Sequence, residues 1–404
     1  MSIRPGLLEI LHRTRRRGLA DSGRRVLRRL SAWLDVQSLD FPLLPEDIAD
    51  STRLRRYEPA DHEVPSQLTV GWICTPPAAG SGGHTTLFRM VEGMEKRGHR
   101  SVLFLYDRHG GDLARHTAVI RQHWPNLKAE IRDATTGLSG VDAYVATSWE
   151  TAHVLASRAT DSRPCLYFIQ DFEPFFYPRG TLQALAEDTY RFGFTNIALG
   201  EMVASELRER GIDCVVAPFG CDTSVYSLTE RGPRSGVVFY AKRGADRRGF
   251  LLARRALEEF HTRHPEQTIH VYGDSVGEWA VPCQRHERLR PEELNDLYNR
   301  TLGGLALSFT NISLVAEEML AAGAICVVND SRQSRADLAN DNVVWAVPTA
   351  GGIADALCRV VEHISPSERS RAAAGSVRHG WQPAEEIVAR AIVSAVEGAR
   401  VISS

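Results

Sequence analysis

The sequence predicts an α/β protein whose two halves have the same kind of fold. Short apolar runs, typical of buried strands, alternate with helical patterns from residue 68 to residue 399. Residues 231–236 have the composition of an interdomain linker. Residues 308–328 suggest a strand end, a polar turn, a helix, a stop at Gly323 and another buried strand. Because open α/β sheets bind ligands beyond the carboxyl ends of their strands, such turns hold the candidate site.

The composition excludes several classes of protein. A chain of 404 residues suggests two domains, and 48 basic against 50 acidic residues give no whole-chain case for a nucleic-acid binder. Seven scattered cysteines form no CxxC pair, which argues against a structural zinc site or a disulfide framework. No apolar run approaches the roughly 18 to 20 residues that span a bilayer, and no secretory signal opens the chain. A reduced, cytoplasmic setting is therefore expected.

The first 66 residues are expected to form a basic extension and a connector. Residues 1–40 place apolar and basic side chains at helical spacing, which suits either peripheral contact with an anionic membrane or a solvated, loosely docked helix pair. Residues 41–66 carry four prolines and suggest an extended connector.

The expected N-terminal domain covers residues 67–232. Residues 68–74 and 101–106 are predicted strands, joined by a glycine-rich loop and a helix, which makes a βαβ unit without a GxGxxG fingerprint. Further strands are expected at residues 143–147, 165–170, 196–199 and 214–217. Residues 170–178 combine two acids with four aromatics at a strand end, which favours a carbohydrate platform over a hydrophobic lid.

The expected C-terminal domain covers residues 233–382. Strand 237–241 leads into a loop with Lys242, Arg243, Arg247 and Arg248, whose charges suit a diphosphate better than a solvated basic loop. Strands are also expected at residues 269–272, 302–308, 324–328 and 343–347. The final segment, 383–404, is an amphipathic helix expected to pack back on the N-terminal domain.

The helix after residue 313 is predicted to bind a nucleotide. Asn311 or Ser313 can cap it, leaving first-turn N–H groups that favour an anion. Glu318 stands one turn further in, where its carboxylate can accept hydrogen bonds from ribose hydroxyls.

The order of these motifs resembles glycosyltransferase family 4, which has the GT-B fold of two Rossmann-like domains facing across a cleft. Residues 318–323 (EMLAAG) match the end of the family's E-x7-E motif, whose first acid would fall at Thr310. Residues 218–222 (PFGCD) match its domain-junction turn, and Lys242 and Arg247 approximately match its basic diphosphate ligands. Residues 167–177 (YFIQDFEPFFY) are similar to the branch that uses dTDP-L-rhamnose for bacterial cell-surface glycans.

The resemblance implies a metal-independent, retaining hexosyltransferase that moves a sugar, best L-rhamnose from dTDP-L-rhamnose, onto a cell-surface glycan or lipid-linked acceptor. It implies no cofactor and no nucleic-acid partner. The donor-binding candidates are Lys242, Arg243, Arg247, Arg248, Thr310, Asn311, Ile312, Ser313 and Glu318. The acceptor and cleft candidates are Gly82, Gly83, His84, Gln170, Phe172, Gly220 and Asp222, with Asp171 and Glu173 as the candidates that orient the acceptor.

Two other functions stay open on the sequence. Another enzyme of this architecture, such as a nucleotide-sugar epimerase or a phosphorylase, would share the diphosphate or phosphate site. A non-catalytic glycan-binding protein would use the aromatic segment and show no response to nucleotides. Release of nucleotide that requires an acceptor glycan distinguishes a transferase from both.

Overall fold

A computed structural model describes residues 41–54, 64–229, 232–287, 289–377 and 380–398. The chain divides into two compact units, Met1–Ile48 and Ala49–Ser404. In the first unit the described residues include one short helical turn, Pro45–Asp47. The predicted basic segment 1–40 lies outside the described residues. In the part of the chain that is described, no helix is long and apolar enough to cross a bilayer.

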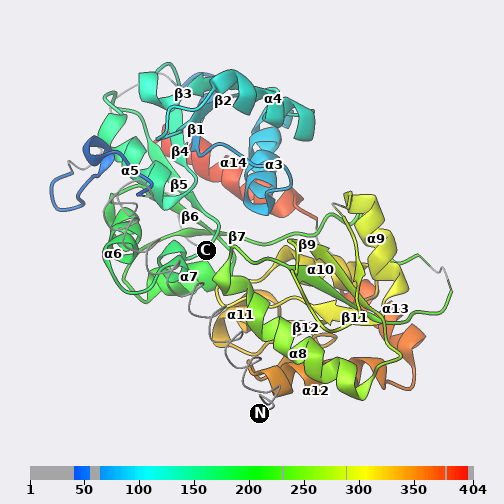
Figure 1. The fold of residues 1–404 in the computed structure, drawn as a ribbon. Coiled ribbons are helices and arrows are strands. Elements are labelled where there is room, and N and C mark those ends of the chain that lie inside the picture. The colour runs from blue at the N-terminus through cyan, green and yellow to red at the C-terminus, as the bar shows by residue number, and fades with distance from the viewer. Residues whose placement is uncertain (1–40, 55–63, 230–231, 288, 378–379, 399–404) are drawn as a thin grey trace, which may run out of the picture. The chain divides into compact units, whose positions relative to one another are not determined.

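The second unit contains two parallel sheets with helices between their strands (Figure 1). The first sheet has seven strands in the order β3-β2-β1-β4-β5-β6-β7. Its strands are β1 (Thr69–Cys74), β2 (Arg100–Leu105), β3 (Glu130–Asp133), β4 (Ala143–Ala146), β5 (Cys165–Ile169), β6 (Thr195–Leu199) and β7 (Val215–Ala217). The helices of this part are α3 (Gly82–Lys96), α4 (Leu113–His123), α5 (Trp149–Arg158), α6 (Thr181–Asp188) and α7 (Glu201–Arg208).

The second sheet has six strands in the order β10-β9-β8-β11-β12-β13. These are β8 (Val237–Ala241), β9 (Ile269–Gly273), β10 (Gln284–Arg285), β11 (Gly303–Leu305), β12 (Ile325–Asn329) and β13 (Val344–Ala346). The helices are α8 (Phe250–Arg263), α9 (Pro291–Arg300), α10 (Leu314–Ala321), α11 (Arg332–Asp337), α12 (Ala350–Val361), α13 (Pro366–Ser376) and α14 (Gln382–Val396).

Each sheet reverses its strand order once, and the reversal marks a ligand-binding position. In the first sheet the chain runs outward from β1 to β3 and then continues from β4 on the other side of β1. In the second sheet the same reversal separates β8 from β11. Loops at such a switch point diverge to opposite sides of the sheet and leave a crevice at the carboxyl ends. The basic loop after β8 and the turn after β11 flank the second switch point.

A pair of glycines lets β11 fit at this switch point. An added Cβ at Gly304 would meet the carbonyl oxygen of Val238 in β8, and one at Gly303 would meet that of Ile325 in β12. Positions 303 and 304 therefore have no room for a side chain, because the neighbouring strands lie too close to β11.

The last helix returns to the first sheet. Helix α14 packs against α3, β6 and β7 (Figure 1). Its apolar stripe is buried with the core of the first sheet, and Val388 and Ile392 are fully inaccessible to solvent. The apolar periodicity of residues 384–399 thus reflects a contact with strands far earlier in the chain.

The expected strands follow the observed ones where both faces are buried. Strands β3 and β10 are not predicted, because they lie at sheet edges and their sequences are mostly polar. The expected strand 302–308 is shorter in the structure, since Ser308 leaves the sheet to begin the turn of the candidate site.

Candidate functional site

The turn after β11 is held rigidly by side chains from three elements. The Ser308 N–H donates to Asn329 Oδ1 at 2.8 Å, and Asn329 Nδ2 donates back to the Ser308 carbonyl at 2.7 Å. Arg248 Nη1 donates to Ser308 Oγ at 2.8 Å, and that hydroxyl donates to the Asn311 carbonyl. Because Ser308 and Asn329 are almost fully buried, these bonds fix the turn in one conformation.

This turn is joined to the loop after β5 by a buried carboxylate. Asp171 Oδ2 accepts a hydrogen bond from Thr310 Oγ1 at 2.8 Å, and Asp171 Oδ1 accepts one from the Asn311 N–H at 3.2 Å. Asn311 Nδ2 donates to the Gln170 carbonyl at 2.5 Å. The carboxyl ends of β5 and β11, from different sheets, therefore meet at Asp171.

The basic loop divides into two pairs of cations. Arg247 Nε lies 3.7 Å from Asp171 Oδ2, with its guanidinium 4.3 Å from the centre of the Phe176 ring. By contrast, Lys242 Nζ lies 3.8 Å from Asp274 Oδ1, and the backbone N–H of Arg243 donates to the same carboxylate at 2.8 Å. The structure thus brings Arg247 and Arg248 to the turn, whereas Lys242 and Arg243 contact the loop after β9.

Burial shapes the charges at this point. It raises the pKa of the Asp171 carboxyl, an effect that Arg247 and Arg248 oppose. Burial, followed by repulsion from Arg247, lowers the pKa of Arg248 to about 10. At this turn, two buried side-chain atoms have no hydrogen-bond partner among the described residues, namely Arg247 Nε and Asn311 Oδ1. Such unpaired buried groups beside a loop at a switch point indicate a place for a polar ligand.

Neither expected cap binds the start of α10. Ser313 is the N-cap residue but its side chain accepts no hydrogen bond, and the Asn311 side chain is used by Gln170. The prediction of a side-chain cap is therefore wrong. Ile312 and Ser313 are buried beside this helix end. Arg248 and Ser313 line a cavity of about 10 Å³, which by itself is far smaller than the roughly 300–1,000 Å³ of a small-molecule site.

Glu318 lies on α10 among groups from the domain junction. Burial raises the pKa of its carboxyl to about 7, with Arg89 opposing and Asp222 reinforcing the shift. Asp222 is paired with Arg89 of α3 at 3.0 Å. Among the described residues, no group donates a hydrogen bond to the Glu318 carboxylate, which leaves it available to a ligand. At the same junction, an added Cβ on Gly220 would approach the Gly380 carbonyl oxygen to 2.5 Å, so Gly220 allows close packing.

The polar side chains of the glycine-rich loop bond within the loop itself, and its glycines let the backbone lie close to a neighbouring loop. Ser81 caps α3, and its Oγ lies 2.8 Å from His84 Nδ1. His84 Nε2 lies 2.9 Å from the Thr75 carbonyl oxygen, so both ring nitrogens have partners. Gly83 faces the Gln170 side chain, with 3.8 Å between an added Cβ and Oε1. This loop and the loop after β5 are therefore neighbours.

The structure removes two residues, Phe172 and Glu173, from the expected aromatic platform. Phe172 is fully buried, stacked on Tyr190 with 5.4 Å between ring centres, so it offers no face to a sugar. Glu173 also turns inward, where it accepts hydrogen bonds from the Trp149 N–H at 2.5 Å and the Tyr167 hydroxyl at 2.6 Å. Burial, followed by repulsion from Glu150, holds the pKa of Glu173 well above its usual range. Of the two acids in this segment, Asp171 alone contacts the turn after β11.

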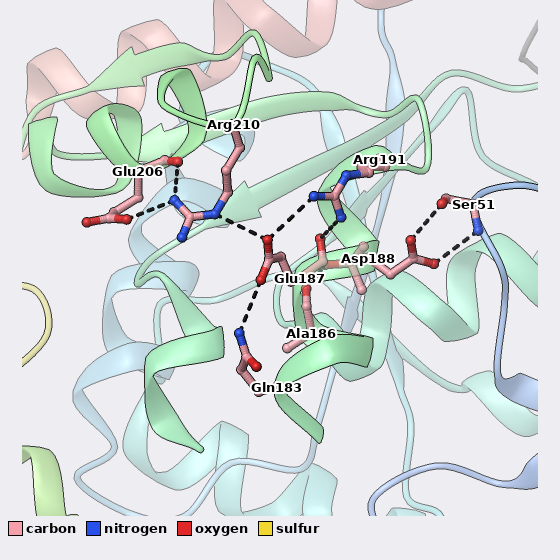
Figure 2. A network of polar contacts seen from close by, with 9 residues as sticks. Ser51, Gln183, Ala186, Glu187, Asp188, Arg191, Glu206 and Arg210 are labelled. Atoms are coloured by element: carbon pink, nitrogen blue, oxygen red, sulfur yellow. Dashed lines mark hydrogen bonds and ion pairs between the residues drawn. The ribbon is translucent and has the colours of Figure 1, made fainter. Parts of the chain in front are cut away.

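A polar network around Arg210 joins α6 to α7 (Figure 2). Arg210 Nη1 pairs with Glu206 Oε2 at 2.9 Å, and Arg210 Nε pairs with Glu187 Oε1 at 3.3 Å. The same guanidinium lies 4.3 Å from the centre of the Phe172 ring. The network ties α6 and α7 to the residue next to Asp171.

Sequence reasoning did not identify three residues of the site. Arg89 pairs with Asp222, Asn329 fixes Ser308, and Asp337 of α11 accepts hydrogen bonds from the N–H groups of Glu201 and Met202 in α7. Asn329 ends a buried apolar strand, which is a signal that could have marked it. Arg89 and Asp337 lie within helices among other charged residues and carry no such signal.

Two protein families match separate parts of the chain. "WsaF, N-terminal domain" matches residues 127–202, and "WsaF, C-terminal domain" matches residues 235–358. The O-antigen biosynthesis protein RfbC of Myxococcus xanthus is 30% identical over 313 residues, which cover 70% of this chain. The chain spans about a quarter of the length of this relative, 24%.

Solved structures share the arrangement of both sheets. A glycosyltransferase from Rickettsia africae has a TM-score of 0.58 at 12% identity, covering 82% of this chain and 99% of that one. The TM-score is 0.57 for a putative UDP-N-acetylglucosamine 2-epimerase from Listeria monocytogenes, at 10% identity, with 84% and 99% covered. It is also 0.57 for HepE of Anabaena in complex with UDP-glucose, at 14% identity, with 82% and 98% covered. The chain therefore has the GT-B fold of glycosyltransferases, with segments that match both WsaF domains.

Proposed function

We propose that this protein transfers a sugar from a nucleoside-diphosphate sugar to a glycan or lipid-linked acceptor in cell-surface polysaccharide synthesis. The observation that carries the proposal is the meeting of Arg247, Arg248 and the turn 308–313 with Asp171, at the β8/β11 switch point. The match to both WsaF domains and the name of the Myxococcus relative support the glycan class. L-rhamnose from dTDP-L-rhamnose is the best candidate donor, on the resemblance of residues 167–177.

The donor's diphosphate is proposed to replace Asp171 at the turn. The Thr310 hydroxyl, the Asn311 N–H and the Arg247 guanidinium are all donors, and all three face the Asp171 carboxylate. A diphosphate also offers anionic oxygens that accept such hydrogen bonds. Donor entry then requires the loops after β5 and β11 to part, and Asp171 is released beside the bound sugar.

Leaving-group charge would be neutralised by fixed cations and amides. Arg247, Arg248 and the N-terminus of α10 supply positive potential without reorganising during the reaction. Lys242 reaches the same phosphates if its exposed side chain leaves Asp274. This arrangement needs no metal ion. Glu318 is proposed to accept hydrogen bonds from the ribose hydroxyls.

Asp171 is the group proposed to orient the acceptor hydroxyl. Once released from the turn, its carboxylate can accept a hydrogen bond from the hydroxyl, provided that the hydroxyl comes within hydrogen-bond reach. The resemblance implies retention of anomeric configuration, and the site offers no group that we assign as a nucleophile. The configuration of the product, read by NMR, tests retention.

The first test is nucleotide-dependent thermal stability. Protein is heated with dTDP, UDP, GDP or ADP, with and without magnesium. A ligand at a hundred times its Kd adds about 2.7 kcal/mol to the unfolding free energy. Selective, metal-independent stabilisation by dTDP that is lost in Arg247→Ala supports the donor site. Preference for UDP or GDP keeps the transferase and rejects rhamnose, whereas no response to any nucleotide overturns the donor site.

The similarity to the Listeria structure is the reason to test one alternative function, that of a nucleotide-sugar epimerase. An epimerase would convert its nucleotide sugar without any acceptor. Incubation of donor sugar with and without lipid-linked glycan separates the two. Nucleoside diphosphate released only with the acceptor supports transfer, and an isomerised nucleotide sugar in the acceptor-free sample supports the epimerase.

A further inference from the structure

A cluster of three metal-ligand types lies on the outer helices of the second sheet. His264 follows the end of α8, while Cys358 and Glu362 stand four residues apart at the end of α12. One ligand atom from each, an imidazole nitrogen, Sγ and a carboxylate oxygen, all lie within 4.8 Å of one another. Helices α8 and α12 pack along each other, so the arrangement depends on the fold.

The three side chains form a graded path from core to solvent. Cys358 is 6% exposed, the His264 side chain is 17% exposed and the Glu362 side chain is 60% exposed. An ion bound between them would be reached from solvent on the Glu362 side. The thiol would complete its coordination from inside.

The imidazole of His264 contacts two carboxylates. Its Nε2 lies 3.0 Å from Glu362 Oε1, and its Nδ1 lies 3.3 Å from Glu266 Oε1. A neutral imidazole carries one N–H, so it can donate to one of these carboxylates and directs a lone pair at the other. A cation between Nε2 and Glu362 removes this conflict. Nδ1–H then donates to Glu266, as in the carboxylate–histidine pairs that orient metal ligands. A protonated imidazole held by both carboxylates is the alternative.

One arginine lies beside the cluster, but it is paired with carboxylates outside the cluster. Arg263 Nη1 lies 3.9 Å from Cys358 Sγ, but Arg263 is itself paired with Asp355 and, at 3.9 Å, with Glu259. The Cys358 thiol is itself buried, with 6% of the residue exposed. A bound metal ion replaces the thiol proton and supplies the charge that a buried thiolate needs.

We propose that His264, Cys358 and Glu362 bind a Zn²⁺ ion that joins the ends of α8 and α12. One thiolate, one imidazole and one carboxylate suit this borderline-soft ion, and the solvent side leaves a fourth position for water. The donor site lies near the other end of α8, and this 14-residue helix is about 20 Å long. The site therefore stabilises the donor domain without entering the transfer reaction.

The absence of a CxxC pair from the sequence predicted that the protein has no structural zinc site. Here the ligands come from two helices, with His264 and Glu362 separated by 98 residues. A motif search restricted to short spacings does not detect such a site.

Metal binding to the full chain tests the proposal directly. Chelator-stripped protein is titrated with Zn²⁺ against a chromophoric zinc indicator, and with Co²⁺ while thiolate-to-cobalt absorption is recorded. We expect one saturable ion per chain, a thiolate band and a raised Tm. Cys358→Ser should abolish the band. His264→Gln should weaken zinc binding at least about tenfold, which is the lower end of the loss of affinity seen when the ligands of a metal site are disturbed. Cys283→Ser, a half-buried cysteine outside the cluster, should leave all three readouts unchanged.

The exposed ligand gives a variant with little risk of misfolding. Glu362→Gln should fold normally, retain the thiolate band and bind zinc more weakly. Unchanged stoichiometry and affinity in folded Cys358→Ser and His264→Gln would overturn the proposal. So would a His264 contribution to Tm that follows pH and ignores Zn²⁺, since that identifies the protonated imidazole. Neither outcome changes the test of the donor site, which is the nucleotide-dependent stabilisation that Arg247→Ala should remove.

Discussion

Asp171 connects two sheets through its two carboxylate oxygens. One oxygen accepts from the Thr310 hydroxyl and the other from the Asn311 N–H, with Arg247 Nε at 3.7 Å. The carboxylate therefore occupies the hydrogen-bond donors that a diphosphate would use. This makes Asp171 both a competitor of the donor phosphates and, once displaced, a group beside the donor sugar.

Asp171→Asn is expected to separate these two roles. The amide keeps the size of the side chain but removes the negative charge, so nucleoside diphosphate should bind as tightly as in the wild type or more tightly. Sugar transfer should fall by about 10²-fold or more, the scale of a lost proton acceptor. Calorimetry measures the first and a radiolabelled-sugar assay the second. Asp246→Asn, an exposed acid in the basic loop, is the matched control. Transfer at the wild-type rate would remove Asp171 from the mechanism.

Glu318 is expected to make donor binding depend on pH. Its pKa of about 7 means that the free site is protonated below that pH and ionised above it. The ionised carboxylate accepts two ribose hydrogen bonds, so nucleotide affinity should rise as the pH increases from about 6 to about 8. Glu318→Gln should lose this slope and weaken binding by roughly 1.5–3 kcal/mol.

Without ligand, the stability of the wild-type protein should depend on pH in the opposite direction, and Glu318→Gln should remove this dependence. A carboxyl whose pKa is raised in the folded state binds more protons when folded than when unfolded. The contribution of Glu318 to wild-type stability therefore falls as the pH rises from about 4.5 through about 7. The amide of Glu318→Gln does not titrate, so the variant does not lose this stability. Thermal denaturation of both proteins near pH 8 should find the variant more stable. Equal melting temperatures across this range would show that Glu318 is not penalised by burial.

At the scale of elements, α7 depends on a side chain from the other sheet. Asp337 of α11 accepts hydrogen bonds from the N–H of Glu201 at 2.5 Å and the N–H of Met202 at 3.0 Å. The α7 N-cap residue is Gly200, which has no side chain to do this. A carboxylate thus reaches across from α11 to satisfy the start of α7.

Asp337→Ala should destabilise the protein by about 0.5–2 kcal/mol, the usual cost of a lost N-terminal cap. Chemical denaturation measures the loss, and hydrogen exchange should locate it in the first turn of α7. Asp341→Ala removes an exposed acid nearby and serves as the control. Protection of α7 that stays at the wild-type level would mean that the contact does not hold this helix.

At the scale of the whole molecule, α14 completes the core of the first sheet. Ile392 is fully buried there, although it follows every strand of the second sheet in sequence. The two sheets are consequently linked twice, through the junction near Gly220 and through the return to α14.

Ile392→Ala should therefore weaken the first sheet by about 2–5 kcal/mol, the range for a deleted core side chain. Hydrogen exchange should show faster opening of β6, β7 and α3, which contact α14. Arg390→Ala, on the exposed face of the same helix, should have little effect. Loss of protection confined to α14 would contradict this dependence.

The alternation of strands and helices could be predicted because most strands are buried on both faces. β1, β5 and β12 are continuous apolar runs bounded by loop residues, and such runs identify parallel strands. β3 and β10 are edge strands with no fully buried residue, so their sequences carry no apolar pattern. The final helix was predicted for a related reason, since α14 presents an apolar stripe to the core.

By itself, the sequence determined the two α/β halves and the chemistry of the loops at their strand ends. Those follow from local periodicity, charge and glycine placement, which are readable within a few residues. Tertiary structure decided which loops meet. Thr310 contacts Asp171 across 139 residues, Phe172 and Glu173 turn into the core, and His264 reaches Cys358 and Glu362 on another helix. Contacts of that kind depend on how sheets and helices pack, and side-chain direction at a loop is set by that packing.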